Sequence, residues 1–159
     1  MSDPRSVNTS STSLWLGVDG GGTKTRVSAV DAQGRVVASV VGGSTNPNSV
    51  GSQARWNLRC VLLRAMLRAQ CGAHVADSGD DSSLEGSEAE EAKLKAHRPP
   101  VDVSDVRRVV LAMAGVDRPA DVQNVKSWIE DLLPNIGTHF FLHFFLIFFN
   151  FFLLYFFYI

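Results

Sequence analysis

The chain has 159 residues, of which 45% are hydrophobic and 19% are charged, and its formal net charge at pH 7 is −1. These values are typical of one modest globular domain, and they lack the basic excess that favours nucleic-acid or anionic-membrane partners. The cysteines Cys60 and Cys71 have neither CxxC spacing nor a companion histidine, so we expect two reduced core thiols in a cytoplasmic protein.

The sequence predicts a disordered N-terminus followed by three antiparallel strands. Residues 1–13 are polar and contain no apolar run like that of a secretory signal. The nearly continuous apolar stretch LWLGVD begins at Leu14 and predicts a strand buried on both faces. Two further apolar runs, separated by a turn at residues 31–34, predict the second and third strands of a meander.

A helix is expected from Gln53 to Cys71, where Gly72 would end it. One face of this helix is apolar, with Ala54, Leu58, Val61, Leu62 and Ala65. Its arginines are Arg55, Arg59, Arg64 and Arg68, and we interpret them as a solvated face and not as a nucleic-acid stripe. Residues 74–105 are rich in Ser, Gly, Asp, Glu and Pro without an apolar period, which predicts a flexible surface insertion.

A fourth strand is expected at residues 107–112, followed by a helix that Asp117 caps and that has Pro119 in its first turn. The apolar stripe of this helix contains Val122, Val125, Ile129, Leu132 and Leu133. Pro134 should terminate the helix, so a further strand should begin near Asn135.

The residues from Asp19 to Thr25, DGGGTKT, carry the clearest chemistry in the sequence. They lie between two predicted antiparallel strands, and their spacing matches neither a Walker A loop nor a Rossmann fingerprint. Three glycines allow a tight turn that brings backbone N–H donors close to an anion, and Thr23 and Thr25 add hydroxyl groups. Asp19 would repel a bare phosphate, so its presence favours a hydrated Mg²⁺ between the carboxylate and the nucleotide. A ligand-free Asp-Gly hairpin is the simpler alternative, but a two-residue turn does not need a third glycine.

Three ordered segments together resemble a known family: DGGGTKT after LWLGV, then STN, then LAMAGVDRPADVQNVKSWIEDLLP. They are similar to the N-acetylglucosamine kinases and benzoyl-CoA-reductase-activator ATPases of the actin-like superfamily, from Leu14 to about Pro134. The resemblance implies an α/β fold, namely the first part of a ribonuclease-H-like lobe, within an enzyme whose two lobes close over ATP, Mg²⁺ and a sugar.

The resemblance also assigns roles to residues. The nucleotide-binding set would be Asp19, Gly20, Gly21, Gly22, Thr23, Lys24 and Thr25, with Asp19 at the metal and Thr23 contacting ATP. Asn46 matches the asparagine with which these kinases bind their sugar, and Gly115 matches a glycine turn that lines the cleft. Taken without the family, Asn46-Pro47 is a turn initiator and Gly115 a tight connection from strand to helix.

The catalytic aspartate of the family is expected at the end of the strand after the second helix, but no Asp or Glu follows Asp131. All ten phenylalanines and both tyrosines lie from Phe140 onward. We therefore treat residues 14–135 as a partial lobe and 136–159 as an apolar tail that does not match the family. A splice or frameshift product is the favoured explanation of the tail, because His143 and Asn150 would be costly in a bilayer.

The resulting expectation is ATP-dependent phosphorylation of N-acetylglucosamine at its 6-hydroxyl in the complete relative, with this chain a truncated and inactive form. The partner would be a small sugar, and a homodimer of the complete relative is left open. Two alternatives remain: an activator-type ATPase, whose cysteine-ligated cluster Cys60 and Cys71 do not provide, and a non-catalytic remnant that the tail anchors to a membrane.

Overall fold

The computed structural model describes residues 13–71, 86–96, 102–134 and 136–141. Its elements in chain order are β1 (Leu14–Gly20), β2 (Lys24–Val30), β3 (Val36–Gly43), α1 (Pro47–Val50), α2 (Gln53–Cys71), α3 (Glu88–Lys95), a 3-10 turn (Val103–Asp105), β4 (Val106–Met113), α4 (Pro119–Glu130) and β5 (Gly137–Phe141).

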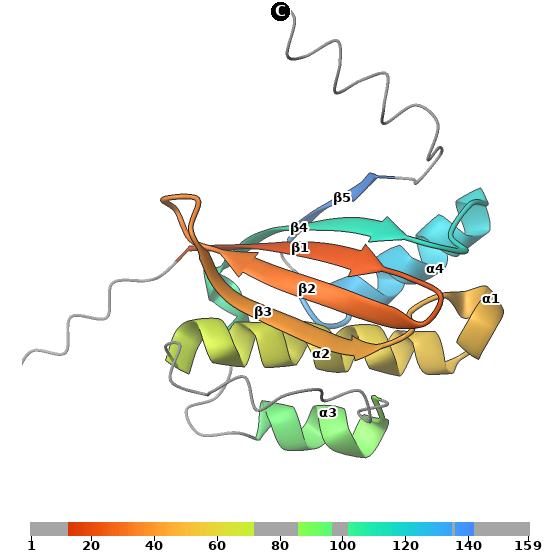
Figure 1. Ribbon diagram of the computed structural model, residues 1–159, viewed down its shortest axis with the longest axis horizontal. Helices are drawn as coiled ribbons and strands as arrows, with labels where there is room; N and C mark the ends of the chain where they lie inside the picture. Colours follow the sequence, from red (N-terminus) through yellow and green to blue (C-terminus); the bar gives the residue numbers. More distant parts are fainter. Residues whose placement is uncertain (1–12, 72–85, 97–101, 135, 142–159) are drawn as a thin grey trace, which may run out of the picture.

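The five strands form one mixed sheet in the order β3-β2-β1-β4-β5 (Figure 1). β2 is antiparallel to both β1 and β3, whereas β4 is parallel to both β1 and β5. An antiparallel meander whose first strand pairs in parallel with a fourth strand, which in turn pairs in parallel with a fifth, is the arrangement expected for a ribonuclease-H-like lobe. The fold class expected from the sequence is therefore confirmed.

The core lies on one face of this sheet. In β1 the side chains of Leu14, Leu16 and Val18 are buried, while Trp15 is 37% exposed and Asp19 is exposed. The described helices all lie on the same side of the sheet, with α2 and α4 directly against it (Figure 1). The prediction that β1 is buried on both faces is therefore wrong for the described residues, and the strand has the alternation of a one-sided sheet.

The long helix α2 has the expected boundaries and the expected buried face. The five predicted apolar residues are each at most 1% exposed: Ala54, Leu58, Val61, Leu62 and Ala65. Cys60 is a buried free thiol, as expected, and burial raises its pKa. Arg59, however, is only 4% exposed, so its assignment to a solvated face is wrong.

The expected flexible insertion contains an ordered helix. Ser87 caps α3, its side chain accepting a hydrogen bond from the backbone N–H of Glu90. For residues 86–96 the prediction of a flexible segment is therefore wrong, because this stretch packs against α2. The rest of the predicted insertion lies largely outside the described residues.

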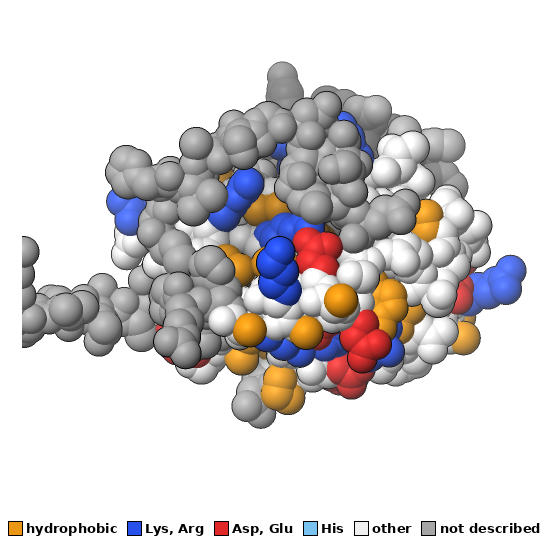
Figure 2. All heavy atoms as spheres, turned by 90° about the horizontal axis from the view of Figure 1, so that it is seen from below, with side chains coloured by type: hydrophobic (Ala, Val, Ile, Leu, Met, Phe, Trp, Pro, Cys, Tyr) orange, Lys and Arg blue, Asp and Glu red, His pale blue; other side chains and the backbone are white. Residues whose placement is uncertain are grey.

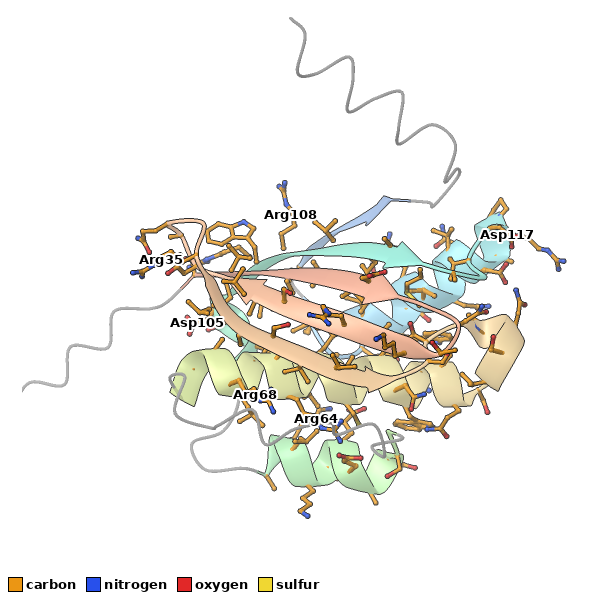
Figure 3. All side chains as sticks on the ribbon, viewed as in Figure 1. Arg35, Arg64, Arg68, Asp105, Arg108 and Asp117 are labelled. Carbon is orange, nitrogen blue, oxygen red and sulfur yellow. The ribbon has the colours of Figure 1, made fainter. Side chains whose placement is uncertain are left out.

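Ion pairs explain why α3 packs there and why Arg59 is buried. Arg59 donates two hydrogen bonds to the carboxylate of Glu91, at 2.5 and 2.7 Å, and a third to the carbonyl oxygen of Trp128 in α4 at 2.8 Å. Arg64, which lies between α2 and α3 (Figure 3), pairs with Glu90. Seen from the side of the helices, acidic and basic side chains lie next to one another (Figure 2). These contacts join α2, α3 and α4 in one layer.

The second predicted helix is shorter than expected at its C-terminal end and is capped differently. Arg118, not Asp117, occupies the N-cap position of α4, and its backbone N–H donates to the Asp121 carboxylate at 3.3 Å. The helix ends at Glu130, four residues before Pro134. Leu132 and Leu133, which follow the end of the helix, are nevertheless buried in the core, as their place in the predicted apolar stripe indicates.

β5 begins two residues after the expected position near Asn135 and pairs with β4. Residues 137–141, at the start of the segment treated as an apolar tail, thus form the edge strand of the described sheet. The expected disordered N-terminus and the rest of the apolar tail lie outside the described residues. No helix within the described part of the chain is long and apolar enough to cross a membrane.

Candidate functional site

Three connections meet at one end of the sheet, where β1 and β4 both end. They are the β1–β2 loop at Gly21–Thr23, the segment Ser44–Asn46 after β3, and the turn after β4. Because β1 and β4 are parallel, their carboxyl ends lie at the same edge. A 2.7 Å hydrogen bond from the Ala114 N–H to the Gly20 carbonyl oxygen continues the β1–β4 pairing into this region.

The glycines of the β1–β2 loop allow close approach of neighbouring groups. A Cβ on Gly20 would collide with Thr45 Oγ1 and would lie 2.9 Å from Met113 Cγ, so this position accommodates glycine only. The Gly21 N–H closes the loop with a 2.9 Å hydrogen bond to the Lys24 carbonyl oxygen. The next two N–H groups, of Gly22 and Thr23, have no hydrogen-bond partner within the described part of the chain.

The charged groups of the loop are also open to solvent. Asp19, Thr23 and Lys24 are exposed, and no ion pair joins Asp19 or Lys24 to another described residue. Mg²⁺ usually keeps several waters and is held by one or two carboxylates together with substrate phosphates. One free carboxylate beside free N–H donors and an ammonium group therefore fits a magnesium nucleotide. Asp19 would bind the metal, and the loop N–H groups and Lys24 would bind the phosphates.

A layer of buried hydroxyl groups lies beneath the loop. Thr25 and Thr45 are each 0% exposed, and Thr25 Oγ1 donates to Thr45 Oγ1 at 2.9 Å. Ser44 Oγ donates to the Gly21 carbonyl oxygen at 3.1 Å. The expectation that Thr25 offers its hydroxyl to phosphate is therefore wrong in this structure, because that hydroxyl is turned into the interior. Sequence reasoning missed Ser44 and Thr45, although two small polar residues directly before Asn46 were a usable signal.

Asn46 caps α1 and lies beside both glycine turns. Its Oδ1 accepts a 2.9 Å hydrogen bond from the Asn48 N–H, as an N-cap side chain does. Its Nδ2 lies 3.9 Å from the position that a Cβ on Gly22 would occupy and has no described partner. Gly115 has φ 75°, which favours glycine, and a Cβ there would collide with Asn46 Oδ1. Asn46 therefore presents mainly its N–H donors.

The structure brings most of the predicted site residues together. Those at the surface of this end of the sheet are Asp19, Gly21, Gly22, Thr23, Lys24, Asn46 and Gly115, whereas Gly20 and Thr25 are buried behind them. Asp117 lies at the same end of the molecule (Figure 3). A cavity of about 320 Å³ lined by Val103, Ser104, Val106, Arg107, Leu133, Pro134 and Ile136 lies at the opposite end of β4 and is not part of this site.

No protein-family model matches the chain. N-acetyl-D-glucosamine kinase of Dictyostelium discoideum is 31% identical over 122 residues, which are 76% of this chain and 31% of that protein. The chain thus spans about a third of the length of this curated relative. Among solved structures, a crystal structure described as a candidate N-acetylglucosamine kinase of Chromobacterium violaceum is similar with a TM-score of 0.43 and 17% identity, covering 82% of this chain and 35% of that one. By its sequence, the chain is therefore a relative of the N-acetylglucosamine kinases and matches part of their length.

Proposed function

We propose that this chain supplies the nucleotide-phosphate loop and the sugar-contacting asparagine of a kinase that phosphorylates N-acetylglucosamine with ATP and Mg²⁺. The observation that carries the proposal is the contact between two glycine turns and one asparagine. Asn46 lies against Gly115 and close to Gly22, at the edge where β1 and β4 end. A sugar bound to Asn46 would therefore lie next to a phosphate bound to the loop.

The phosphate side of the proposal uses the free donors of the loop. Gly22 and Thr23 offer unpartnered N–H groups, and Lys24 adds a positive charge. Backbone donors of this kind hold an anion without reorganisation, and Asp19 would position a magnesium ion that neutralises the phosphates. Phosphoryl transfer relies mainly on such positioning and charge neutralisation.

The sugar side of the proposal uses the amide donors of Asn46 that bond to no other described residue. Because Oδ1 already accepts the Asn48 N–H, the free Nδ2 is the group offered to a sugar hydroxyl oxygen. The capping bond fixes the orientation of the amide, so this donor is held ready before the sugar binds.

We further propose that these 159 residues bind their ligands without transferring phosphate. A general base must be within hydrogen-bond reach of the attacking hydroxyl. The kinases that the chain resembles have an aspartate for this role on the strand after the second helix, and here that strand, β5, has no Asp or Glu. A kinase assay of the full chain in detergent should therefore give no N-acetylglucosamine phosphate. Turnover by this chain would show that another group serves as the base.

The sugar assignment is tested with Asn46→Ser, studied by calorimetric titration of the full chain in detergent. The serine keeps an uncharged N-cap oxygen for the Asn48 N–H but loses the amide donors. We expect N-acetylglucosamine affinity to fall by about 1 to 3 kcal/mol, the scale of a lost hydrogen bond that leaves its partner unpaired. Affinity for the magnesium nucleotide should change far less. Asn46→Ala is the comparison, because it removes both the donor and the cap. Equal losses for both ligands in Asn46→Ser would make Asn46 a structural residue.

A further inference from the structure

Asn57 in α2 is a buried side chain whose amide contacts two separate parts of the chain. It is only 3% exposed. Its Nδ2 donates to the Ser44 carbonyl oxygen at 2.7 Å, and its Oδ1 accepts from the Gly86 N–H at 2.7 Å and from Gln53 Nε2 at 3.0 Å. Gly43 leaves the room for this contact, because a Cβ there would lie 2.8 Å from Asn57 Nδ2. Asn57 thus joins the start of the α3 segment to the end of β3.

Ser44 extends this set of hydrogen bonds from Asn57 to the candidate site. Its hydroxyl donates to the Gly21 carbonyl oxygen at 3.1 Å and accepts from the Asn46 N–H at 3.2 Å. Ser44 is 5% exposed, so its hydroxyl is largely shielded from bulk water. One side chain therefore links the loop proposed to bind phosphate with the residue proposed to bind sugar.

At its other end the connection depends on the docking of residues 86–95. A Cβ on Gly86 would collide with the Trp56 carbonyl group and would lie 2.7 Å from the Asn57 N, so the segment reaches α2 only because residue 86 is glycine. Gln53 Nε2 also donates to the Gly86 carbonyl oxygen. Cys60 Sγ lies 3.7 Å from the Ser87 carbonyl oxygen, which places the thiol under the docked segment.

We propose that Asn57 and Ser44 are positioning residues that couple the docking of residues 86–95 to the geometry of the candidate site. The assignment of ligands to that site rests on the proposed function, but the coupling itself is a property of this chain. Gly86 and Gln53 both donate to Oδ1, whereas Ser44 offers an acceptor, so the amide of Asn57 has one orientation that satisfies all three partners. When the segment leaves α2, Oδ1 loses the Gly86 N–H and keeps only Gln53 as a donor, so that orientation is held less firmly.

Gly86→Ala tests this coupling without changing any residue of the candidate site. Amide hydrogen exchange is followed by NMR on the full chain in detergent, and undocking is followed by the alkylation rate of Cys60 in a Cys71→Ser background. We expect faster alkylation together with about 3- to 10-fold faster exchange of the Asn46 N–H, which donates to Ser44 Oγ, the factor for one lost hydrogen bond. Leu58→Ala, the next residue along α2, is the matched control for general loss of stability, and it should raise exchange across the whole sheet without favouring the Asn46 amide.

Ser44 supplies the second test. Ser44→Ala should raise exchange at Asn46 while leaving Cys60 alkylation unchanged, because α3 stays docked, and Ser44→Thr should restore slow exchange because it keeps the hydroxyl. Faster alkylation in Gly86→Ala with unchanged exchange at Asn46 would overturn the coupling. Unchanged alkylation in that variant would overturn it as well, because Gly86 would then not hold the segment in place.

Titration of the unsubstituted chain with magnesium nucleotide and with N-acetylglucosamine separates this proposal from the function of the site. If neither ligand binds, the proposed function fails for this chain, whereas the exchange results still decide the coupling. If both bind, Gly86→Ala should weaken both, because Ser44 contacts the loop and Asn46 alike.

Discussion

The hydroxyl of Thr25 in β2 donates a 2.9 Å hydrogen bond to the hydroxyl of Thr45, and both side chains are completely buried beneath the β1–β2 loop. The bond joins the strand that leaves the loop to the segment that carries Asn46. Two buried hydroxyl groups are tolerated there because they satisfy one another.

Removing one of these hydroxyl groups should therefore destabilise the protein more than removing both. Thr25→Val should lower the free energy of unfolding by about 1 to 3 kcal/mol, because the Thr45 hydroxyl is left buried without its partner. In the double variant Thr25→Val with Thr45→Val much of this loss should be recovered. Urea unfolding of the full chain in detergent measures all three proteins, and additive losses would mean that the two hydroxyl groups act independently.

Gly20 should not tolerate a methyl group, whereas Gly17 in the same strand should. A Cβ on Gly20 would collide with Thr45 Oγ1, but a Cβ on Gly17 would meet nothing closer than the Ser28 carbonyl oxygen at 4.0 Å. Gly20→Ala should lower stability by about 1 to 3 kcal/mol, the usual range for overpacking. Gly17→Ala is the matched control and should leave the urea midpoint nearly unchanged. Similar midpoints for both variants would contradict the close packing of the loop against Thr45.

The carboxylate of Asp19 should help nucleotide binding only when Mg²⁺ is present. Asp19→Asn should weaken magnesium-nucleotide binding by about 1 to 3 kcal/mol, the scale of a lost charge-assisted contact. Without metal the same variant should bind nucleotide equally well or better, since a negative charge beside the phosphates has been removed. Calorimetric titration with and without a chelator gives both values. Asp117→Asn, a second exposed carboxylate at this end of the molecule, is the control (Figure 3).

Docking of α3 should weaken in acid. Burial alone would raise the pKa of Glu91, but hydrogen bonds from Arg59 and Lys95 outweigh burial and hold that pKa below the ordinary value of 4.5. A carboxyl whose pKa is lower in the folded state stabilises the fold fully above its unfolded value, and this stabilisation is lost as the pH falls through the folded value. The docked segment should therefore be protected at neutral pH and lose protection progressively as the pH falls below 4.5.

Hydrogen exchange of the full chain, measured by mass spectrometry on the proteolytic fragment that contains residues 88–95, gives this loss. The exchange rate is divided by the intrinsic rate of the unstructured segment at each pH. Glu91→Gln should already show weak protection at neutral pH and little further loss in acid, since a buried ion pair that loses one partner is destabilised by about 3 to 5 kcal/mol. Protection in the unsubstituted chain that stays equal as the pH falls from neutral through the acid range would mean that the Arg59–Glu91 pair does not hold α3.

The sequence by itself determined the elements whose signals are local. Gln53–Cys71 forms the predicted helix because its apolar residues recur at helical spacing, and three successive glycines between apolar runs mark the loop after β1. The order of the three segments that resemble kinases also gave Asn46 and Gly115, which lie in contact although 69 positions separate them. Their proximity follows from the sheet, in which β2 pairs with β3 and β1, and β1 pairs with β4, so that β3 and β4 end at the same edge.

Tertiary structure decided which polar residues are buried. Nothing in the local sequence distinguishes Arg59 from Arg55 or Arg68, because its burial depends on a carboxylate 32 residues away that reaches it only when α3 docks. Thr25 and Thr23 look equivalent in the sequence, yet the pleat of β2 turns the hydroxyl of Thr25 inward to Thr45 and leaves Thr23 exposed in the loop. A buried polar group needs a partner, and the partner of each of these groups comes from a distant part of the chain, so only the folded arrangement could reveal it.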